Sequence, residues 1–161
     1  MGEYSGMENL DQVIFYKLEK AIRSYRQFAQ RQIRDAGFTI TIDQWLTIKN
    51  ILEHPDIKQQ ELAENVFKDN ASVTRIIELL VKAKYLKRKV HKDDRRRTTL
   101  TVTKEGAEVV AKVSEVILQN REKALEGIEQ SKMRTLDKVL LKITENCSNG
   151  SKENTDKSFI T

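Results

Sequence analysis

The sequence predicts a mainly α-helical fold with one small β-hairpin. Proline occurs once, at Pro55, and the six glycines are widely scattered, so long stretches lack residues that break helices. Apolar residues recur three or four positions apart along most of the 161 residues, which is the period of one helix face. Strand-like alternation is confined to a short region near residue 100. These observations make helices the dominant element.

The first two predicted helices are amphipathic and have clear ends. The first covers residues 10–36 and ends at Gly37. Its apolar positions are Ile14, Leu18, Ala21, Ile22, Tyr25, Phe28, Ala29 and Ile33. The second begins after Thr41, which forms with Gln44 the residue pair typical of a capping box, and Pro55 ends it. Its apolar stripe consists of Trp45, Ile48, Ile51 and Leu52.

Two short helices and a hairpin are expected next. The helices cover residues 59–66 and 70–82, with Asp69 as the N-cap of the second, and their close succession predicts a helix-turn-helix. The stretches 87–91 and 98–102 have the character of short extended segments, and residues 99–102 alternate with a period of two. This pattern favours a hairpin. Its loop is Lys92-Asp93-Asp94-Arg95-Arg96-Arg97.

The chain closes with two more helices. Thr103 is placed to cap a long helix over residues 104–126, and Gly127 and Ser131 separate it from the last helix. That helix has apolar positions at Met133, Leu136, Val139, Leu140 and Ile143. We therefore divide the chain into an N-terminal dimerisation helix, a helix-turn-helix head with a hairpin, C-terminal dimerisation helices and a flexible tail. The ranges are 1–36, 37–103, 104–146 and 147–161.

Positive charge is concentrated in the hairpin region. Residues 84–97 contain eight Lys and Arg and two Asp, a net charge of +6, whereas the whole chain carries +5. A basic run by itself is more typical of an ordinary solvated surface. Here it directly follows a helix-turn-helix, which is the order of elements in a winged-helix DNA-binding domain.

Several short motifs resemble the MarR family of bacterial transcription regulators over residues 10–145. They are Gln44-Trp45, Glu61-Leu62-Ala63-Glu64, Ser72-Val73-Thr74-Arg75, Asp94-Arg95-Arg96 and Val102-Thr103-Lys104-Glu105-Gly106. The resemblance implies a dimeric winged-helix repressor that a small phenolic or other effector releases from its operator. Three residues depart from the family pattern. Lys58 stands where the family usually has a Thr helix cap, Lys84 where it usually has a Gly, and Val102 where it usually has a Leu. A left-handed conformation at Lys84 costs about 1 kcal/mol.

The candidate DNA-binding residues fall in two groups. The first lies on the free side of the second helix of the helix-turn-helix: Asn70, Ala71, Ser72, Thr74 and Arg75. Short polar side chains suit a major groove, and an arginine can pair bidentately with guanine. The second group lies in the hairpin loop: Lys92, Asp94, Arg95, Arg96 and Arg97. The resemblance matches Arg96 to the family's minor-groove arginine, which Asp94 would orient, while Arg95 and Arg97 face phosphates.

The terminal helices carry more apolar residues than a small head can cover. These are Val13, Ile14 and Leu18 in the first helix and Val139, Leu140 and Ile143 in the last. A twofold homodimer would bury them; intramolecular packing of three helices is the alternative. A dimer sets two reading helices about 34 to 36 Å apart, which predicts double-stranded DNA with a near-palindromic operator as the partner.

An effector site is expected between the first, second and fifth helices, where Tyr16, Phe28 and Trp45 could supply aromatic walls for a small aromatic molecule. Aromatic residues at helical spacing are more often core residues. Cys147, the single cysteine, raises the alternative of a redox-responsive regulator, although a thiol in a polar C-terminal segment is more often without a role.

Other classes of protein find little support in the sequence. The two histidines, His54 and His91, are isolated, and no glycine-rich phosphate loop or metal-binding Cys/His spacing occurs, so we expect neither an enzyme nor a cofactor nor a metal. The absence of an apolar run of about 18 residues and of a signal-peptide profile predicts a soluble cytoplasmic protein without membrane contact. The predicted function is sequence-specific regulation of transcription; the alternative is a winged-helix module that binds another protein.

Overall fold

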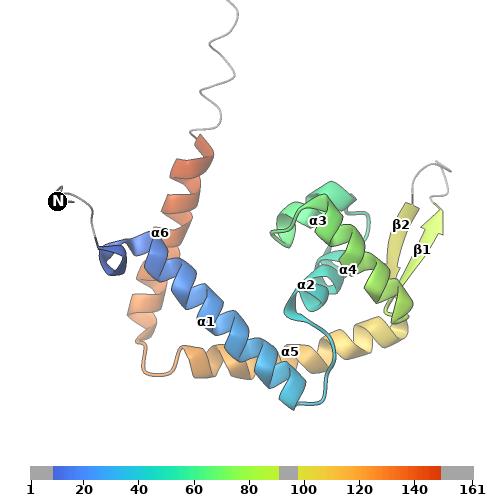
Figure 1. Cartoon of the computed structure of the whole chain (residues 1–161), viewed down its shortest axis with the longest axis horizontal. Coiled ribbons are helices and arrows are strands. Elements are labelled where there is room, and N and C mark those ends of the chain that lie inside the picture. Colours follow the sequence, from blue (N-terminus) through green and yellow to red (C-terminus); the bar gives the residue numbers. More distant parts are fainter. Residues whose placement is uncertain (1–8, 91–97, 150–161) are drawn as a thin grey trace, which may run out of the picture. The chain divides into compact units, whose positions relative to one another are not determined.

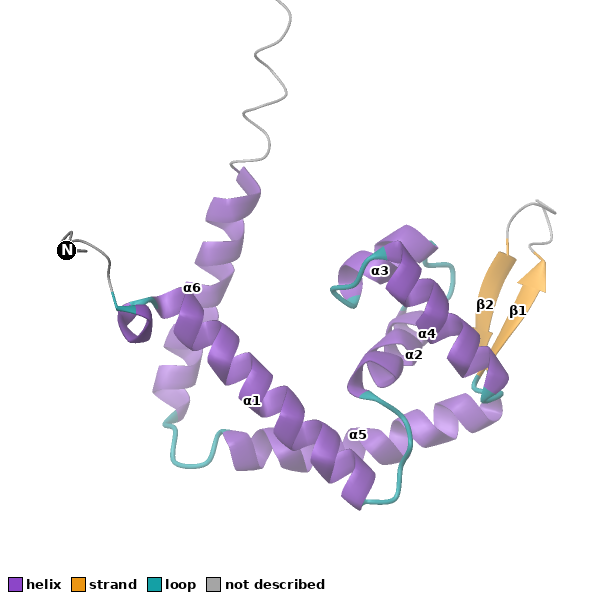
Figure 2. Ribbon diagram, in the orientation of Figure 1, coloured by secondary structure: helices purple, strands orange, loops and turns teal. Residues whose placement is uncertain are grey.

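A computed structural model describes residues 9–90 and 98–149 and shows six α-helices and one antiparallel hairpin in those ranges (Figures 1 and 2). The helices are η1 (Leu10–Gln12, a 3-10 turn), α1 (Ile14–Asp35), α2 (Ile42–Glu53), α3 (Gln59–Asn65), α4 (Asn70–Lys82), α5 (Lys104–Ala124) and α6 (Gln130–Asn149). Strands β1 (Leu86–Val90) and β2 (Thr98–Val102) pair with Leu86 opposite Val102. The predicted fold class, mainly helical with a small hairpin, is confirmed.

Local hydrogen bonds define where the helices begin. Thr41 and Gln44 form the expected capping box, since the Thr41 Oγ1 accepts from the Gln44 amide at 3.1 Å and the Gln44 Oε1 accepts from the Thr41 amide at 2.9 Å. At α4 an Asp69 oxygen accepts from the Ser72 amide at 2.7 Å. This bond lowers the pKa of Asp69 below its ordinary value. At α3 the side chain of Lys58 provides no cap, and Glu61 accepts the Lys58 amide instead.

Two helix boundaries differ by more than two residues from those predicted. The first helix is interrupted at Val13, whose extended backbone separates η1 from α1. The last helix continues to Asn149, past the expected start of the tail at residue 147. Near this end the hydroxyls of Thr144 and Ser148 donate to the carbonyls four residues earlier, at 3.0 and 2.8 Å, an arrangement that is compatible with a helical backbone. The rest of the predicted tail, residues 150–161, lies outside the described residues.

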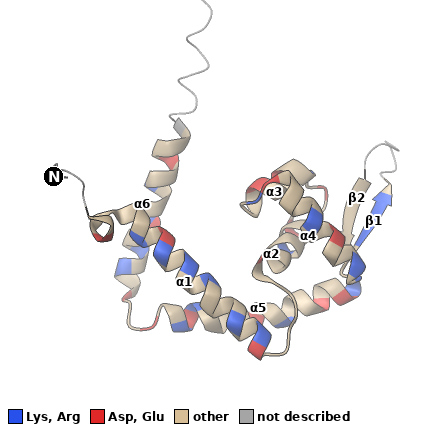
Figure 3. Ribbon diagram, viewed as in Figure 1, with Lys and Arg blue, Asp and Glu red and all other residues tan. Residues whose placement is uncertain are grey.

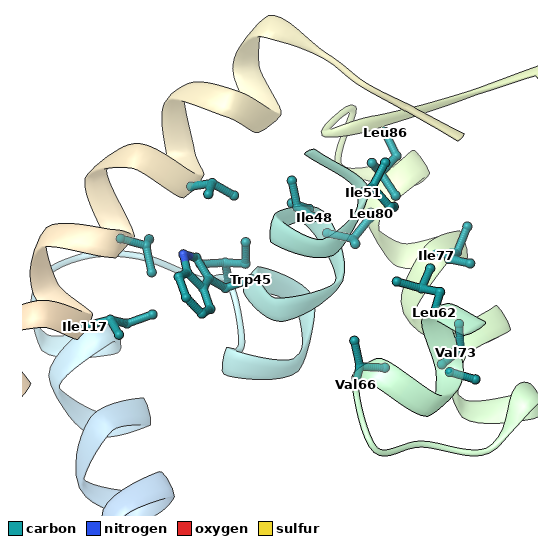
Figure 4. Packing of buried hydrophobic residues seen from close by; sticks show 14 of the residues in the cluster. Trp45, Ile48, Ile51, Leu62, Val66, Val73, Ile77, Leu80, Leu86 and Ile117 are labelled. Carbon is teal, nitrogen blue, oxygen red and sulfur yellow. The ribbon is translucent and has the colours of Figure 1, made fainter. Parts of the chain in front are cut away.

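One hydrophobic core joins the helix-turn-helix to α5. Ile48 of α2, Leu62 of α3, Val73 of α4 and Val113 of α5 are fully buried and belong to a single cluster, much of which Figure 4 shows. The compact unit that contains this core extends to Ala124, and Leu125 begins a second unit that contains α6. The predicted division between residues 103 and 104 therefore lies inside the first unit.

Three helices end at a residue in the left-handed conformation. Gly37, Phe67 and Lys84 have φ values of 89°, 58° and 65° after α1, α3 and α4, respectively. In each case the next amide donates to the carbonyl five residues earlier, for example Tyr85 to Leu80 at 2.9 Å, which is the Schellman motif. Lys84, which stands where the family usually has a glycine, thus has the expected left-handed conformation. Phe67 shares it without having been predicted.

Replacing either of these two side chains by glycine should stabilise the fold. We expect Phe67→Gly and Lys84→Gly each to raise the free energy of unfolding by about 0.5 to 1 kcal/mol, because glycine removes the left-handed penalty. The Phe67 side chain is 85% exposed, so little packing is lost. Urea unfolding measures the effect. Lys82→Gly, within α4, is the control and should destabilise; a loss of stability in all three variants would contradict the expected relief of strain.

Candidate nucleic-acid interface

The helix α4 presents a polar face opposite the core. Val73, Ile77 and Leu80 are buried, and their spacing leaves the other side of the helix accessible. Of the five residues expected to read DNA, Asn70, Ala71 and Arg75 are exposed, whereas Ser72 and Thr74 are half-buried. The structure therefore presents the first group of candidate residues on one helix, at and near its N-terminus.

Hydrogen bonds within the protein already engage two of these candidates. The Ser72 hydroxyl donates to Asp69 Oδ2 at 3.0 Å. The Thr74 hydroxyl donates to the Asn70 carbonyl at 2.8 Å and accepts from Gln59 Nε2 at 2.7 Å. Among the described residues, the side chains of Asn70 and Arg75 have no such partner and so have free donor and acceptor groups.

Gln59 is a member of this surface that sequence reasoning missed. It is the first residue of α3, 15 positions before Thr74, and the hydrogen bond between them places its amide against α4. Gln59 has a polar side chain, and the sequence pattern predicts that it lies at the start of a helix. It does not show which neighbouring helix the side chain meets, so no signal in the sequence pointed to this contact.

A compact junction attaches the wing, which consists of β1, β2 and the loop between them, to α4 and α5. The amide of Thr103 donates to the Tyr85 carbonyl at 3.0 Å, and its hydroxyl donates to the Lys84 carbonyl at 2.7 Å. The same hydroxyl accepts from the Gly106 amide at 3.0 Å, which confirms Thr103 as a cap of α5. Gly106 is required because a Cβ there would lie 2.3 Å from the Tyr85 oxygen. The junction fixes the base of the wing relative to α4.

The described part of the basic run lies on the wing and its approach. Lys84, Lys87, Arg88 and Lys89 are all exposed, and Figure 3 shows basic residues along β1. The hairpin-loop candidates are Lys92, Asp94, Arg95, Arg96 and Arg97. They lie in residues 91–97, outside the described ranges, together with His91.

The three aromatic residues expected to form an effector site are not brought together. Trp45 is buried in the core beside Ile117 (Figure 4), and its indole nitrogen donates to Ser114 Oγ at 3.1 Å. Tyr16 and Phe28 are 12 residues apart on α1, which separates them by about 18 Å along the helix. Within one chain these side chains cannot line a single small pocket.

A cleft of about 400 Å³, lined mostly by long polar and charged side chains, lies between α1 and the start of α2. Arg26, Arg31 and Arg34 of α1 line it, together with Asp43 of α2. Asp43 forms two ion pairs: one with Arg26, and one with Lys68 of the α3–α4 turn at 3.1 Å. One carboxylate therefore links α1 and the helix-turn-helix.

Other candidate residues have no site around them. His54 is exposed at the end of α2, and Cys147 is exposed on α6. Within the described ranges no three His, Cys, Asp or Glu side chains converge as metal ligands would. Among the same residues, no helix combines the length and apolar character needed to cross a membrane.

Known proteins resemble this chain in sequence and fold. Residues 40–98 match the model of the MarR family. BpsR of Bordetella bronchiseptica, described as regulated in DNA binding by 6-hydroxynicotinic acid, has a TM-score of 0.77 and 19% identity, over 86% of this chain and 98% of that one. MarR from E. coli has a TM-score of 0.68 and 17% identity, over 81% of this chain and 96% of that one. CouR of Rhodococcus jostii, bound to p-coumaroyl-CoA, has a TM-score of 0.72 and 15% identity, over 85% of this chain and 95% of that one.

The family match includes the elements that form the polar surface described above. It spans α2, α3, α4 and β1, which are the helix-turn-helix and the first strand of the wing. MarR-family regulators are DNA-binding proteins and not enzymes, in agreement with the absence of a catalytic motif from the sequence. The helix-turn-helix and the first strand of the wing, residues 40–98, thus match the MarR family of transcription regulators.

Proposed function

We propose that this regulator is a cytoplasmic homodimer that represses transcription by binding a near-palindromic operator and is released by a small aromatic acid. The observation that carries the proposal is the free polar face of α4, with Asn70 and Arg75 unengaged, beside a basic wing that Thr103 and Gly106 hold at a fixed place. This combination suits a helix in the major groove with a wing that reaches an adjacent groove.

Exposed apolar side chains support the dimer. On α1, Ile14, Phe15 and Ile22 are each more than half exposed. On α6, Val139, Leu140 and Leu141 are also exposed. Of the other residues expected to be uncovered, Val13, Leu18 and Ile143 are half-buried. Apolar faces of this extent are typical of protein interfaces, and a second copy of the chain would cover them.

The wing provides the second contact with DNA in this proposal. We propose that Arg96 enters a minor groove next to the major groove that α4 occupies, with Asp94 as its orienting partner. Lys92, Arg95 and Arg97 would contact phosphates. The exposed cations at the wing base, including Lys87 and Lys89, extend the same positive surface.

Arg96→Ala should weaken operator binding by about 1 to 3 kcal/mol and reduce the preference for A·T pairs at the flanks of the site. Fluorescence anisotropy with a duplex from the upstream region of the chain's own gene measures both effects. Arg134→Ala on α6 removes the same charge from an exposed position and is the control. Equal affinities of the two variants, with unchanged flank preference, would remove Arg96 from the mechanism.

The effector is proposed to bind in the arginine-lined cleft between α1 and α2. BpsR responds to an aromatic acid, and a carboxylate is a natural partner for arginine. A ligand carboxylate on Arg26 would compete with Asp43, which also pairs with Lys68 just before α4. By linkage, an acid that releases the operator must itself bind more weakly to the DNA-bound protein. Calorimetric titration of 6-hydroxynicotinic acid with and without operator tests this coupling, and equal affinities would refute it.

A further inference from the structure

A cleft of about 240 Å³ separates the polar face of α4 from the wing. Its floor includes Leu100 of β2, and its polar border comes from four elements. The border residues are Gln59 of α3, Thr74 and Glu78 of α4, Arg88 of β1 and Thr98 of β2. Gln59, Arg88 and Thr98 can donate hydrogen bonds to a ligand, whereas the Thr74 hydroxyl already donates to the Asn70 carbonyl. Arg88 is the one cation among the five residues.

If α4 occupies a major groove and the wing an adjacent minor groove, the DNA strand between the grooves must pass this cleft. We propose that the cleft binds one phosphate of that strand and that Arg88 is the principal phosphate ligand. This inference rests on the proposed function and adds to it a contact outside α4 and the hairpin loop. Such a contact fixes the register of the protein on DNA without reading bases.

The position of Arg88 supports this assignment. It pairs with Leu100 across the hairpin and lies two residues after buried Leu86, so its side chain shares the strand face that looks toward the cleft. Among the described residues no carboxylate lies within ion-pair distance of Arg88, although Glu78 borders the same cleft. The guanidinium is therefore available to an external anion, and a bidentate contact with phosphate matches its geometry.

Neighbouring groups would complete the phosphate site. One Gln59 N–H donates to Thr74, which orients the amide and leaves its second N–H free. The exposed Thr98 at the start of β2 can donate its hydroxyl. Glu78 acts in the opposite direction, because its charge repels a phosphate. The cleft thus contains one charge that favours DNA binding, on Arg88, and one that opposes it, on Glu78. Removal of these two charges should therefore change the affinity for DNA in opposite directions.

The test uses the full chain and an operator duplex from its own upstream region, with anisotropy measured over a range of KCl concentrations. Arg88→Gln should weaken binding about tenfold or more and reduce the slope of log K against log salt by about 1. Glu78→Gln should strengthen binding several-fold. Lys87→Gln is the matched control: it removes one positive charge from the opposite face of β1, near Glu105, and should have the smaller effect.

Duplexes with a single neutral methylphosphonate locate the contact. One position should weaken the wild type as much as Arg88→Gln does and should have no further effect on that variant, whereas Lys87→Gln should retain sensitivity there. The inference is overturned if Arg88→Gln matches Lys87→Gln and remains sensitive at every position, or if Glu78→Gln weakens binding. If the wild type binds no duplex, the proposed function fails together with this contact; if only the Arg88 results fail, the proposed function stands.

Discussion

Gly106→Ala is expected to lower the free energy of unfolding by about 2 to 3 kcal/mol, the usual cost of forcing an extra group into a close-packed site. The added Cβ would lie 2.3 Å from the Tyr85 carbonyl oxygen and close to the rest of that backbone, which cannot rotate away as a side chain could. The same carbonyl accepts from the Thr103 amide. Relief of the clash must therefore separate the wing from the start of α5, and DNA binding should weaken as well.

The sign of this effect distinguishes close packing from helix propensity. Gly106 lies in the first turn of α5, and glycine in a helix interior is about 1 kcal/mol less favourable than alanine. Propensity alone therefore predicts that Gly106→Ala stabilises. Ala111→Gly, at an exposed position of the same helix, measures the propensity effect and is the control. Urea unfolding in which Gly106→Ala is more stable than the wild type would contradict the packing described here.

Features set by neighbouring residues were predictable from the sequence. The capping box of Thr41 and Gln44 and the Asp69 cap are hydrogen bonds between residues three positions apart. Their formation depends on local backbone geometry, so the residue types and their spacing suffice to predict them. The left-handed conformation at Lys84 was expected for a different reason, because the resemblance to a family places a glycine there.

Features set by tertiary contacts were not predictable in the same way. Trp45 was considered for an effector pocket, yet its indole reaches Ser114, 69 residues later, inside the core. Gln59 meets Thr74 across two helices. A periodic pattern shows which face of a helix is apolar but not which element covers that face. Phe67 lacked both signals, since an exposed phenylalanine at a left-handed position follows neither propensity nor burial.

Disruption of the proposed dimer should have the largest effect on DNA binding. Leu140 is 40% exposed on α6 and lies in the apolar face that we expect a second copy to cover. Leu140→Glu would place a charge in that interface, and a twofold dimer contains the substitution twice. Each leucine lost from a packed interface costs about 2 kcal/mol or more, so the dissociation constant of the dimer should rise by about a thousandfold.

The consequence for DNA follows from the geometry of a palindromic operator. A monomer contacts one half-site, whereas a dimer sets two copies of α4 about one helical turn apart. Sedimentation velocity should show Leu140→Glu as a monomer of 18.7 kDa at micromolar concentration, with operator affinity reduced at least a hundredfold. Ser131→Glu, at an exposed polar position on the opposite side of α6, adds the same charge and should remain dimeric. If Leu140→Glu also remains a dimer with full operator affinity, the apolar face of α6 is not the interface, and the two reading helices must be held together by other residues.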